Sequence, residues 1–283
     1  MVKGLQSNWE QRAAVCTERW GLSNLKWLPD VSTAHVGFCM SPRGEAVLKV
    51  SIAPEMVLHE ASALEHFGSA ICPQVFGVAL DLDALLIERF DIIEDLSAIY
   101  PDPRHEIDVW LPIFDAVRTR TEIPDGFPDL AQYSEVFDRV LKMQVRPSVA
   151  KLMRYGRDHT HILLGAPEEN RLLHGDMHHF NILRDRAGHW KLIDPHGVIG
   201  HPLYELGAFL RNPWGACCAE PGVMDRLAAR AELLAERLLI PVGVVAEYGF
   251  YGAAFSVAWS LEEESDDYDG MVVMSEALLS LVT

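Results

Sequence analysis

The stretch His174-Gly-Asp-Met-His-His-Phe-Asn181, followed by Lys191-Leu-Ile-Asp-Pro195, decides the fold of this chain. Its first acid, Asp176, stands five positions before Asn181, and a second acid, Asp194, ends the apolar run that follows. Three short apolar segments around these residues are typical of β-strands, at residues 171–173, 181–183 and 190–193. The pattern therefore predicts that two acids and one amide meet at the end of a small hairpin.

These residue types suit phosphoryl transfer by the route that protein kinases use. That chemistry needs a carboxylate near the attacking hydroxyl, and an Asn and an Asp that hold Mg²⁺ on the nucleotide phosphates. Asp176 is the expected catalytic base, and the hard oxygens of Asn181 and Asp194 are the expected ligands of Mg²⁺. Gly175 stands where protein kinases have the Arg that binds the phosphorylated activation loop. Regulation by phosphorylation of such a loop is therefore not expected.

Two other interpretations of this stretch stay open. The first is an ordinary surface loop, because a bare Asp-x4-Asn pattern is common by chance. A metal-dependent hydrolase is the second alternative, because histidines surround Asp176 and more histidines follow it. Its candidate ligands are His174, Asp176, His178, His179, His189, His196 and His201. We prefer the kinase hypothesis because it makes further predictions upstream that the sequence meets.

The first of these predictions is a lysine that reaches the nucleotide phosphates. Residues 46–50 read as a strand of the Val-Ala-Ile-Lys type, which carries Lys49. Residues 55–67 read as the following helix, with a proline at its first turn. Glu60 in this helix is the expected ion-pair partner of Lys49, with Glu65 as the alternative.

A hinge and a covering loop complete the expected nucleotide site. Residues 84–90 read as a buried strand that ends in a hinge, where backbone groups of Glu88 and Phe90 are expected to bond the adenine edge. The loop that covers the phosphates is expected to contribute Ser32, Thr33 and backbone N–H groups. This loop lacks the Gly-x-Gly-x-x-Gly of protein kinases, so the choice between ATP and GTP stays open.

With these elements in order, the chain resembles the aminoglycoside phosphotransferase superfamily, and within it the streptomycin 6-kinase and hydroxyurea phosphotransferase group. The resembling segments are residues 44–50, the helix around Glu60, and residues 86–90, 173–183 and 192–213. The resemblance implies an α+β, bilobal protein-kinase-like fold. It places a small antiparallel-sheet N-lobe at residues 1–90 and a mainly helical catalytic and substrate-binding C-lobe at residues 91–283.

The resemblance also implies a function. We expect a cytoplasmic small-molecule kinase that transfers the γ-phosphoryl group of ATP, or of GTP, to a hydroxyl of a streptomycin-like aminoglycoside, with Mg²⁺ as cofactor. The alternatives are a metabolic or hydroxyurea-type kinase of the same fold, and a nucleotide-binding relative without catalysis. Only nine positions separate Asp194 from Leu203, where a helix is expected to begin, and a regulated activation loop needs more chain than that.

The remaining pattern gives a coarse layout of the elements. An amphipathic helix is expected at residues 7–20, and N-lobe strands at 25–28, 36–40, 45–50, 74–79 and 84–88. Further helices are expected at residues 94–99, 105–118, 130–143, 148–164, 203–210, 222–239, 242–261 and 271–281.

Charge and composition limit the partners. The net charge is −17, and no basic stripe appears, so nucleic acid is not an expected partner. Acids gather at residues 262–269, where Glu263, Glu264 and Asp267 are candidate contacts for a cationic acceptor. A solvated loop is the alternative explanation of this charge run.

Several features argue against a secreted or membrane protein. The five cysteines show neither redox nor zinc spacing, so reduced core thiols are expected. The N-terminal residues contain no apolar stretch of the kind found in signal peptides. Glu247 interrupts the apolar run at residues 241–260, which therefore reads as a buried helix rather than a membrane span.

Overall fold

The computed structural model of this chain describes residues 9–29, 33–100, 102–213 and 222–282. The chain forms two compact units, one of residues 1–93 with 183–196 and the other of residues 94–182 with 197–283. Residues 183–196, which the expected division at residue 90 assigns to the C-lobe, are thus part of the first unit.

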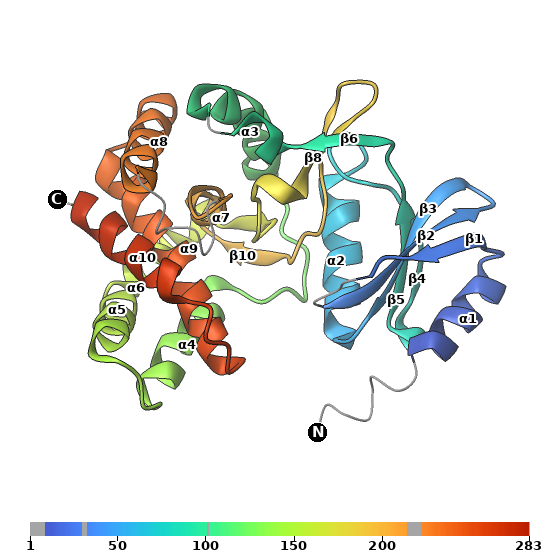
Figure 1. The fold of residues 1–283 in the computed structure, drawn as a ribbon, viewed down its shortest axis with the longest axis horizontal. Helices are drawn as coiled ribbons and strands as arrows, with labels where there is room; N and C mark the ends of the chain where they lie inside the picture. The colour runs from blue at the N-terminus through green and yellow to red at the C-terminus, as the bar shows by residue number, and fades with distance from the viewer. Residues whose placement is uncertain (1–8, 30–32, 101, 214–221, 283) are drawn as a thin grey trace. The chain divides into compact units, whose positions relative to one another are not determined.

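The first unit is built on a five-stranded antiparallel sheet with strand order β1-β2-β3-β5-β4 (Figure 1). The strands are β1 (Ser23–Trp27), β2 (Ala34–Ser41), β3 (Gly44–Ser51), β4 (Val75–Ala79) and β5 (Ala84–Glu88). Neighbouring side chains along a strand point to opposite faces. In β3 this alternation sends Ala46, Leu48 and Val50 into one buried face and leaves Lys49 on the other.

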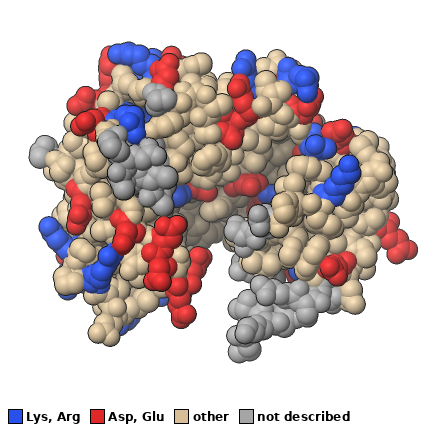
Figure 2. Space-filling view, viewed as in Figure 1, with Lys and Arg blue, Asp and Glu red and all other residues tan. Residues whose placement is uncertain are grey.

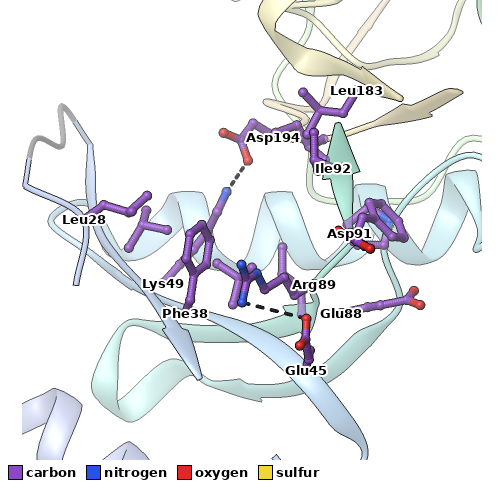
Figure 3. Close-up of a pocket in the computed structure, with 16 residues that line it drawn as sticks. Leu28, Phe38, Glu45, Lys49, Glu88, Arg89, Asp91, Ile92, Leu183 and Asp194 are labelled. Carbon is purple, nitrogen blue, oxygen red and sulfur yellow. Dashed lines mark hydrogen bonds and ion pairs between the residues drawn. The ribbon is translucent and has the colours of Figure 1, made fainter. Parts of the chain in front are cut away.

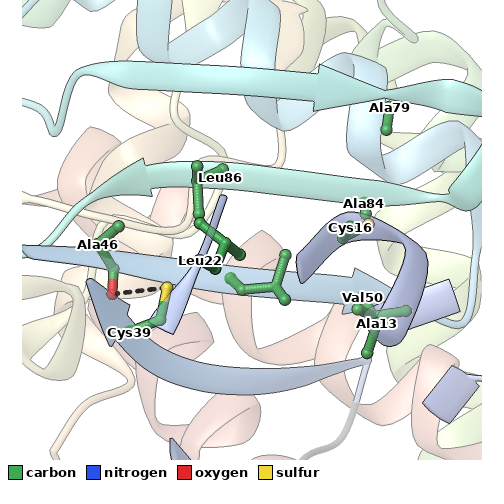
Figure 4. Close-up of a cluster of buried hydrophobic side chains, with 10 residues drawn as sticks. Ala13, Cys16, Leu22, Cys39, Ala46, Val50, Ala79, Ala84 and Leu86 are labelled. Carbon is green, nitrogen blue, oxygen red and sulfur yellow. Dashed lines mark hydrogen bonds between the residues drawn. The ribbon is translucent and has the colours of Figure 1, made fainter. Parts of the chain in front are cut away.

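Two helices cover the two faces of this sheet (Figure 1). Helix α1 (Trp9–Arg19) buries Ala13 and Cys16 in a cluster with the apolar side chains of β3 and β5 (Figure 4). Helix α2 (Pro54–Phe67) begins with a proline at its first turn and contacts β3, β4 and β5. The face of β3 that carries Lys49 therefore looks toward α2 rather than α1.

A second, three-stranded sheet has the order β6-β8-β9, and most of its residues belong to the first unit. Its strands are β6 (Ile92–Asp95), β8 (Ile182–Asp185) and β9 (Trp190–Leu192). The β8–β9 hairpin confirms two of the strands predicted around the catalytic motif. Lys191 ties β9 to the end of α2, because its Nζ donates to the carbonyls of Ser69 at 3.1 Å and Ala70 at 2.9 Å.

The second unit is mainly helical. Its helices are α3 (Pro103–Arg118), α4 (Leu130–Leu141), α5 (Pro147–Asp158), α6 (Thr160–Leu164), α7 (Glu205–Leu210), α8 (Val223–Leu238), α9 (Val242–Glu262) and α10 (Asp269–Leu281). A two-stranded antiparallel sheet of β7 (Arg171–Leu173) and β10 (Val198–Gly200) precedes α7 in the chain. The first of the three strands predicted around the catalytic motif, residues 171–173, therefore pairs with β10 and not with β8.

Helix α9 contains most of the apolar run at residues 241–260. Most of its residues between Val245 and Ala258 are buried against other helices of the second unit, which confirms the prediction of a buried helix. Within the described ranges, no helix combines the length and apolar character that crossing a membrane requires.

Two predicted helices differ from the structure. The helix expected at residues 94–99 is the end of β6 followed by a 3₁₀ turn at Leu96–Ile99, where the Asp95 side chain accepts from the Ser97 N–H. The helix expected at 148–164 is broken at His159 into α5 and α6. Thr160 Oγ1 donates to the carbonyls of Gly156 and Arg157, and such side-chain bonds compete with the helical ladder.

Helices α7 and α9 approach each other closely through two glycines. A Cβ placed on Gly252 of α9 would lie 2.4 Å from the Cα of Gly207 and 2.7 Å from its carbonyl oxygen. Backbone atoms cannot move aside as a flexible side chain can, so this crossing requires glycine. It fixes α7, the helix that begins with Glu205.

Gly252→Ala is expected to destabilise the protein by about 1–3 kcal/mol, because the added methyl group separates α7 from α9. The measurement is the free energy of unfolding from urea denaturation. Glu276→Ala, at an exposed position of α10, serves as the control and is expected to change that free energy by no more than about 0.5 kcal/mol. Equal unfolding midpoints for Gly252→Ala and wild type would contradict the close contact.

Candidate active site

The first unit contains a cavity of about 490 Å³, within the range that small ligands occupy (Figure 3). It lies on the face of the sheet that carries Lys49. Its walls are Leu28, Val36, Phe38, Glu45, Val47, Lys49, Pro73, Ile87, Glu88, Arg89, Phe90, Asp91, Ile92, Leu183, Ile193 and Asp194. Most of these side chains are apolar, with Lys49 and Asp194 supplying a charged end, so the cavity suits a flat apolar group joined to an anionic one.

Lys49 is held between two carboxylates at that charged end. Its Nζ lies 2.6 Å from Glu60 Oε1, which confirms the predicted pair, and it also contacts the carboxylate of Asp194 (Figure 3). Burial alone would lower the pKa of Lys49, but the charges of Asp194 and Glu60 outweigh it and raise that pKa above the ordinary value. Lys49 therefore stays protonated, and its ammonium group lies against the carboxylate of Asp194.

The backbone around Asp194 supports this position. Asp194 adopts a positive φ of 57°, a left-handed conformation that Asp tolerates better than most residues. The next residue, Pro195, has a fixed φ and no N–H to satisfy. The side chain of Asp194 is 46% exposed, so it remains open to a ligand in the cavity while it contacts Lys49.

The hinge residues line the cavity as expected, but the side chain of Glu88 has another use. Its Oε2 accepts from the backbone N–H of Gln74 at 3.1 Å, and its own N–H donates to the Gln74 carbonyl at 2.8 Å. The side chain and the N–H of Glu88 are thus engaged with Gln74, and base recognition by the Glu88 carbonyl and the backbone of Phe90 stays a prediction. Sequence reasoning missed Arg89, whose guanidinium stacks 4.1 Å from the ring centre of Phe38.

Neither of the two residues expected in the covering loop is among the described residues that line this cavity. Ser32 lies outside the described residues. Thr33 is exposed, its carbonyl accepts from the Ile52 N–H at 3.0 Å, and it does not line the cavity. Their role in phosphate binding stays a prediction.

The second unit holds the predicted base on the loop after β7. Asp176 Oδ1 contacts Arg211 Nη2, and Asp176 Oδ2 lies 3.3 Å from His178 Nε2. Asn181 Nδ2 donates to the Asp176 carbonyl at 2.9 Å, so the two residues lie together as predicted. Asp194 belongs to the other unit, and its convergence with this pair stays a prediction.

The other histidines of the motif are engaged within the fold. His174 is fully buried, and its Nδ1 accepts from the Asp176 N–H at 3.2 Å. His179 is also fully buried, and desolvation lowers its pKa to about 4, so its ring is neutral at pH 7. These structural uses differ from those required of hydrolase ligands. In the part of the chain described, no three His, Cys, Asp or Glu side chains are placed to hold a metal ion together.

Glu205 supports the loop after β7 (residues 174–181), which is called the catalytic loop from here on. It is fully buried at the start of α7, and its Oε1 accepts from the backbone N–H of Gly175 at 3.0 Å. Gly175 has a positive φ of 85°, a conformation that glycine adopts without strain. Burial raises the pKa of Glu205 to about 7, even though the loop N–H groups oppose this shift. The only sequence signal for this residue was an acid near the start of a predicted helix.

The candidate acceptor contacts lie where α9 ends and α10 begins. Glu263, Glu264 and Asp267 are all exposed, and acidic side chains gather over this region of the second unit (Figure 2). The acids at the two ends of the run are paired, Glu262 with Arg139 at 2.6 Å and Asp269 with Arg146 at 2.5 Å. The structure is compatible with both a docking surface and a solvated loop.

An antiparallel sheet that presents a Lys–Glu–Asp cluster, together with a helical unit that carries an Asp–Asn loop, defines the class of kinase-like phosphotransferase folds. Residues 19–263 match the family described as aminoglycoside/hydroxyurea antibiotic resistance kinases. Because the match covers most of the chain, this protein belongs to that family.

Individual relatives agree with this assignment. A streptomycin 6-kinase from Streptomyces glaucescens is 24% identical over 202 residues, which are 69% of this chain and 64% of that protein. A hydroxyurea phosphotransferase from Kitasatospora aureofaciens is 30% identical over 210 residues, which are 72% of this chain and 62% of that protein. In both cases the chain spans less than two thirds of the relative's length.

A solved structure confirms the expected fold class. The chain is similar to a thermostable mutant of aminoglycoside phosphotransferase APH(4)-Ia in ternary complex with ADP and hygromycin B. The TM-score is 0.72 at 17% sequence identity, covering 95% of this chain and 97% of that chain. The protein therefore has the α+β, protein-kinase-like fold of the aminoglycoside phosphotransferases.

Glu205 should make the stability of the protein depend on pH. Its folded-state pKa of about 7 exceeds the ordinary 4.5, so the bound proton stabilises the fold below the ordinary value, and this stabilisation is lost as the pH rises through about 7. Between pH 5 and pH 8 the wild type should lose about 2–3 kcal/mol of unfolding free energy relative to Glu205→Gln, which cannot ionise. Parallel pH curves for the two proteins, from urea denaturation, would contradict the buried, proton-binding carboxyl.

Proposed function

We propose that this protein is a small-molecule kinase that transfers the γ-phosphoryl group of a nucleoside triphosphate to a hydroxyl of an aminoglycoside-type acceptor. The observation that carries the proposal is Lys49, held between Glu60 and Asp194 at the charged end of a mostly apolar cavity. Kinases of this fold use such a Lys–Glu pair on the phosphates and such an Asp on the metal. The names of the two relatives support the same chemistry.

The nucleotide is proposed to occupy the cavity of the first unit. Its base would lie between the apolar side chains of Val36, Val47 and Ile87 and bond the backbone of Glu88 and Phe90. Its phosphates would lie at Lys49, whose positive charge offsets theirs. The donor is ATP or GTP, and the two differ in which groups on the edge of the base donate to this backbone and which accept from it.

Mg²⁺ is the proposed cofactor, and the donor set fits it. Asp194 offers an exposed carboxylate beside the lysine that meets the phosphates. Asn181 donates through Nδ2 to the Asp176 carbonyl, which orients its Oδ1, the atom a metal ligand must present, away from that carbonyl. Hard oxygen ligands of this kind are the ones Mg²⁺ prefers, and the bound ion would offset charge on the phosphates.

Asp176 is the proposed base. Its carboxylate is 15% exposed and is held by Arg211 on one oxygen and by His178 on the other. A carboxylate fixed in this way can accept the proton of an acceptor hydroxyl and orient the oxygen for in-line attack. This contribution comes from positioning, since the loop backbone is itself fixed by Glu205 and Asn181.

The acceptor is proposed to be a polycation captured by the exposed acids Glu263, Glu264 and Asp267. Carboxylates without close cationic partners raise the local concentration of a cationic ligand and speed its capture. The alternative acceptor is a small, hydroxyurea-type molecule, which the 30% identity to a hydroxyurea phosphotransferase favours. A coupled ADP-release assay over aminoglycosides, hydroxyurea and small alcohols separates the two. Nucleotide binding with no stimulation by any acceptor would argue against a kinase.

Asp176→Asn is expected to lower kcat by about 10²–10⁴-fold, because the amide cannot accept the hydroxyl proton. The Kd for the nucleotide should not change, since the cavity that binds it lies in the other unit. The measurements are the coupled assay and isothermal titration with a non-hydrolysable nucleotide. Near-full activity of this variant would rule out Asp176 as the base.

Neutralising the acidic loop with Glu263→Gln, Glu264→Gln and Asp267→Asn together is expected to raise KM for a cationic acceptor by about tenfold, with kcat unchanged, because capture is electrostatic. The difference from wild type should shrink at high salt, which screens exposed charges. A neutral acceptor, tested in the same assay, should show the same KM with both proteins. An unchanged KM for the cationic acceptor would leave this segment as a solvated loop.

A further inference from the structure

The second unit contains a buried network of charged and polar side chains that the proposed mechanism does not use. Glu106 on α3 and His179 on the catalytic loop are fully buried, and Arg230 on α8 is 1% exposed. Arg230 Nη2 contacts Glu106 Oε2, and His179 Nε2 lies 3.4 Å from both atoms. Three segments that are distant in the sequence are thus joined in the interior.

Arg230 also holds the segment that carries Arg211. Its Nη1 donates to the carbonyl of Phe209 at 3.2 Å and to that of Asn212 at 2.6 Å, on either side of Arg211. Its guanidinium lies 4.9 Å from the centre of the Phe209 ring, on which the His179 ring stacks at 4.9 Å. The backbone that positions Arg211 is therefore fixed from the same network as the catalytic loop.

Helix α3 makes a second bond to that loop. Trp110, one turn after Glu106, donates from Nε1 to the carbonyl of Met177 at 3.2 Å. Met177 follows Asp176 directly in the chain, and His179 lies three positions after Asp176. The two ends of the contact between Asp176 and Arg211 are thus anchored to one set of buried groups.

We propose that Glu106, His179 and Arg230 are positioning residues that hold the catalytic loop and the Arg211 segment in register, so that Arg211 fixes the carboxylate of Asp176. This inference rests on the proposed function only for its kinetic consequence. Its structural content, that the network restrains both segments, can be tested without any substrate.

Stability alone does not explain the network. Charged groups removed from water cost folding free energy, and apolar side chains of similar volume often serve a core as well or better. The network is also incompletely paired, because no described residue hydrogen-bonds to Glu106 Oε1 or His179 Nδ1. An apolar set would fill the same space without this cost, but it could not bond the carbonyls of Phe209 and Asn212.

The apolar triple variant Glu106→Leu, His179→Leu, Arg230→Met separates positioning from stability. We expect the variant to stay folded, with a cooperative melting transition, and the nucleotide Kd to be unchanged. We also expect kcat to fall about 100-fold, because misplacement by about 1 Å is enough for such a loss. Hydrogen exchange should be faster at the amides of residues 174–181 and 209–212 and unchanged in α9.

The matched control is Asp108→Leu with Arg237→Met. This ion pair joins the same helices, α3 and α8, but is exposed. It should change neither kcat nor exchange in the two segments. Arg230→Lys is the second variant, in case the triple variant does not fold. It keeps the charge but lacks the planar fork that bonds both carbonyls and Glu106, so kcat should fall and exchange should rise.

Wild-type kcat and exchange in a folded triple variant, or in Arg230→Lys, would overturn the inference. A wild type that binds nucleotide but phosphorylates no acceptor would instead count against the proposed function. In that case the exchange measurement still decides whether the network restrains the two segments.

Discussion

The contact of Lys49 with Glu60 and Asp194 is the interaction on which the proposed nucleotide site depends. It joins β3, α2 and the segment after β9 within the first unit. Phosphates at Lys49 would share its ammonium group with these two carboxylates. A divalent cation bound near Asp194 would offset the added negative charge, in agreement with the proposed Mg²⁺.

The elements that the sequence predicted well are those whose signal is local. The alternation in β3, the proline at the start of α2 and the short strands around the motif each follow from neighbouring residues, and the structure contains them. The pair of Lys49 and Glu60 could be predicted because the kinase pattern places, on the helix after the lysine strand, a glutamate that holds the lysine. The break at His159 could not, because the helical pattern of the sequence continues across it, and the side-chain bonds of Thr160 that accompany the break are visible only in the structure.

The supporting residues of the catalytic loop carry no such local signal. Arg230 meets Glu106 across 124 positions, and Arg211 meets Asp176 across 35. In the sequence each is an ordinary charged residue of an amphipathic or polar segment, and nothing nearby marks it as buried. Glu205 is similar, because its partner is a backbone N–H, which leaves no trace in residue identity. Sequence motifs thus identify the groups that would touch substrate, whereas the groups that would hold them are found only in the fold.

The charges around the base also constrain the acceptor. Arg211 places a cation directly against Asp176, so an acceptor that brought an ammonium group to this carboxylate would be repelled by the guanidinium. The exposed acids of the loop after α9 carry the opposite charge and belong to the same unit. These charges would favour a polycationic acceptor that places its ammonium groups at the acidic loop and an uncharged hydroxyl at Asp176. A small neutral acceptor would gain nothing from the loop and would rely on the geometry of Asp176, Arg211 and His178.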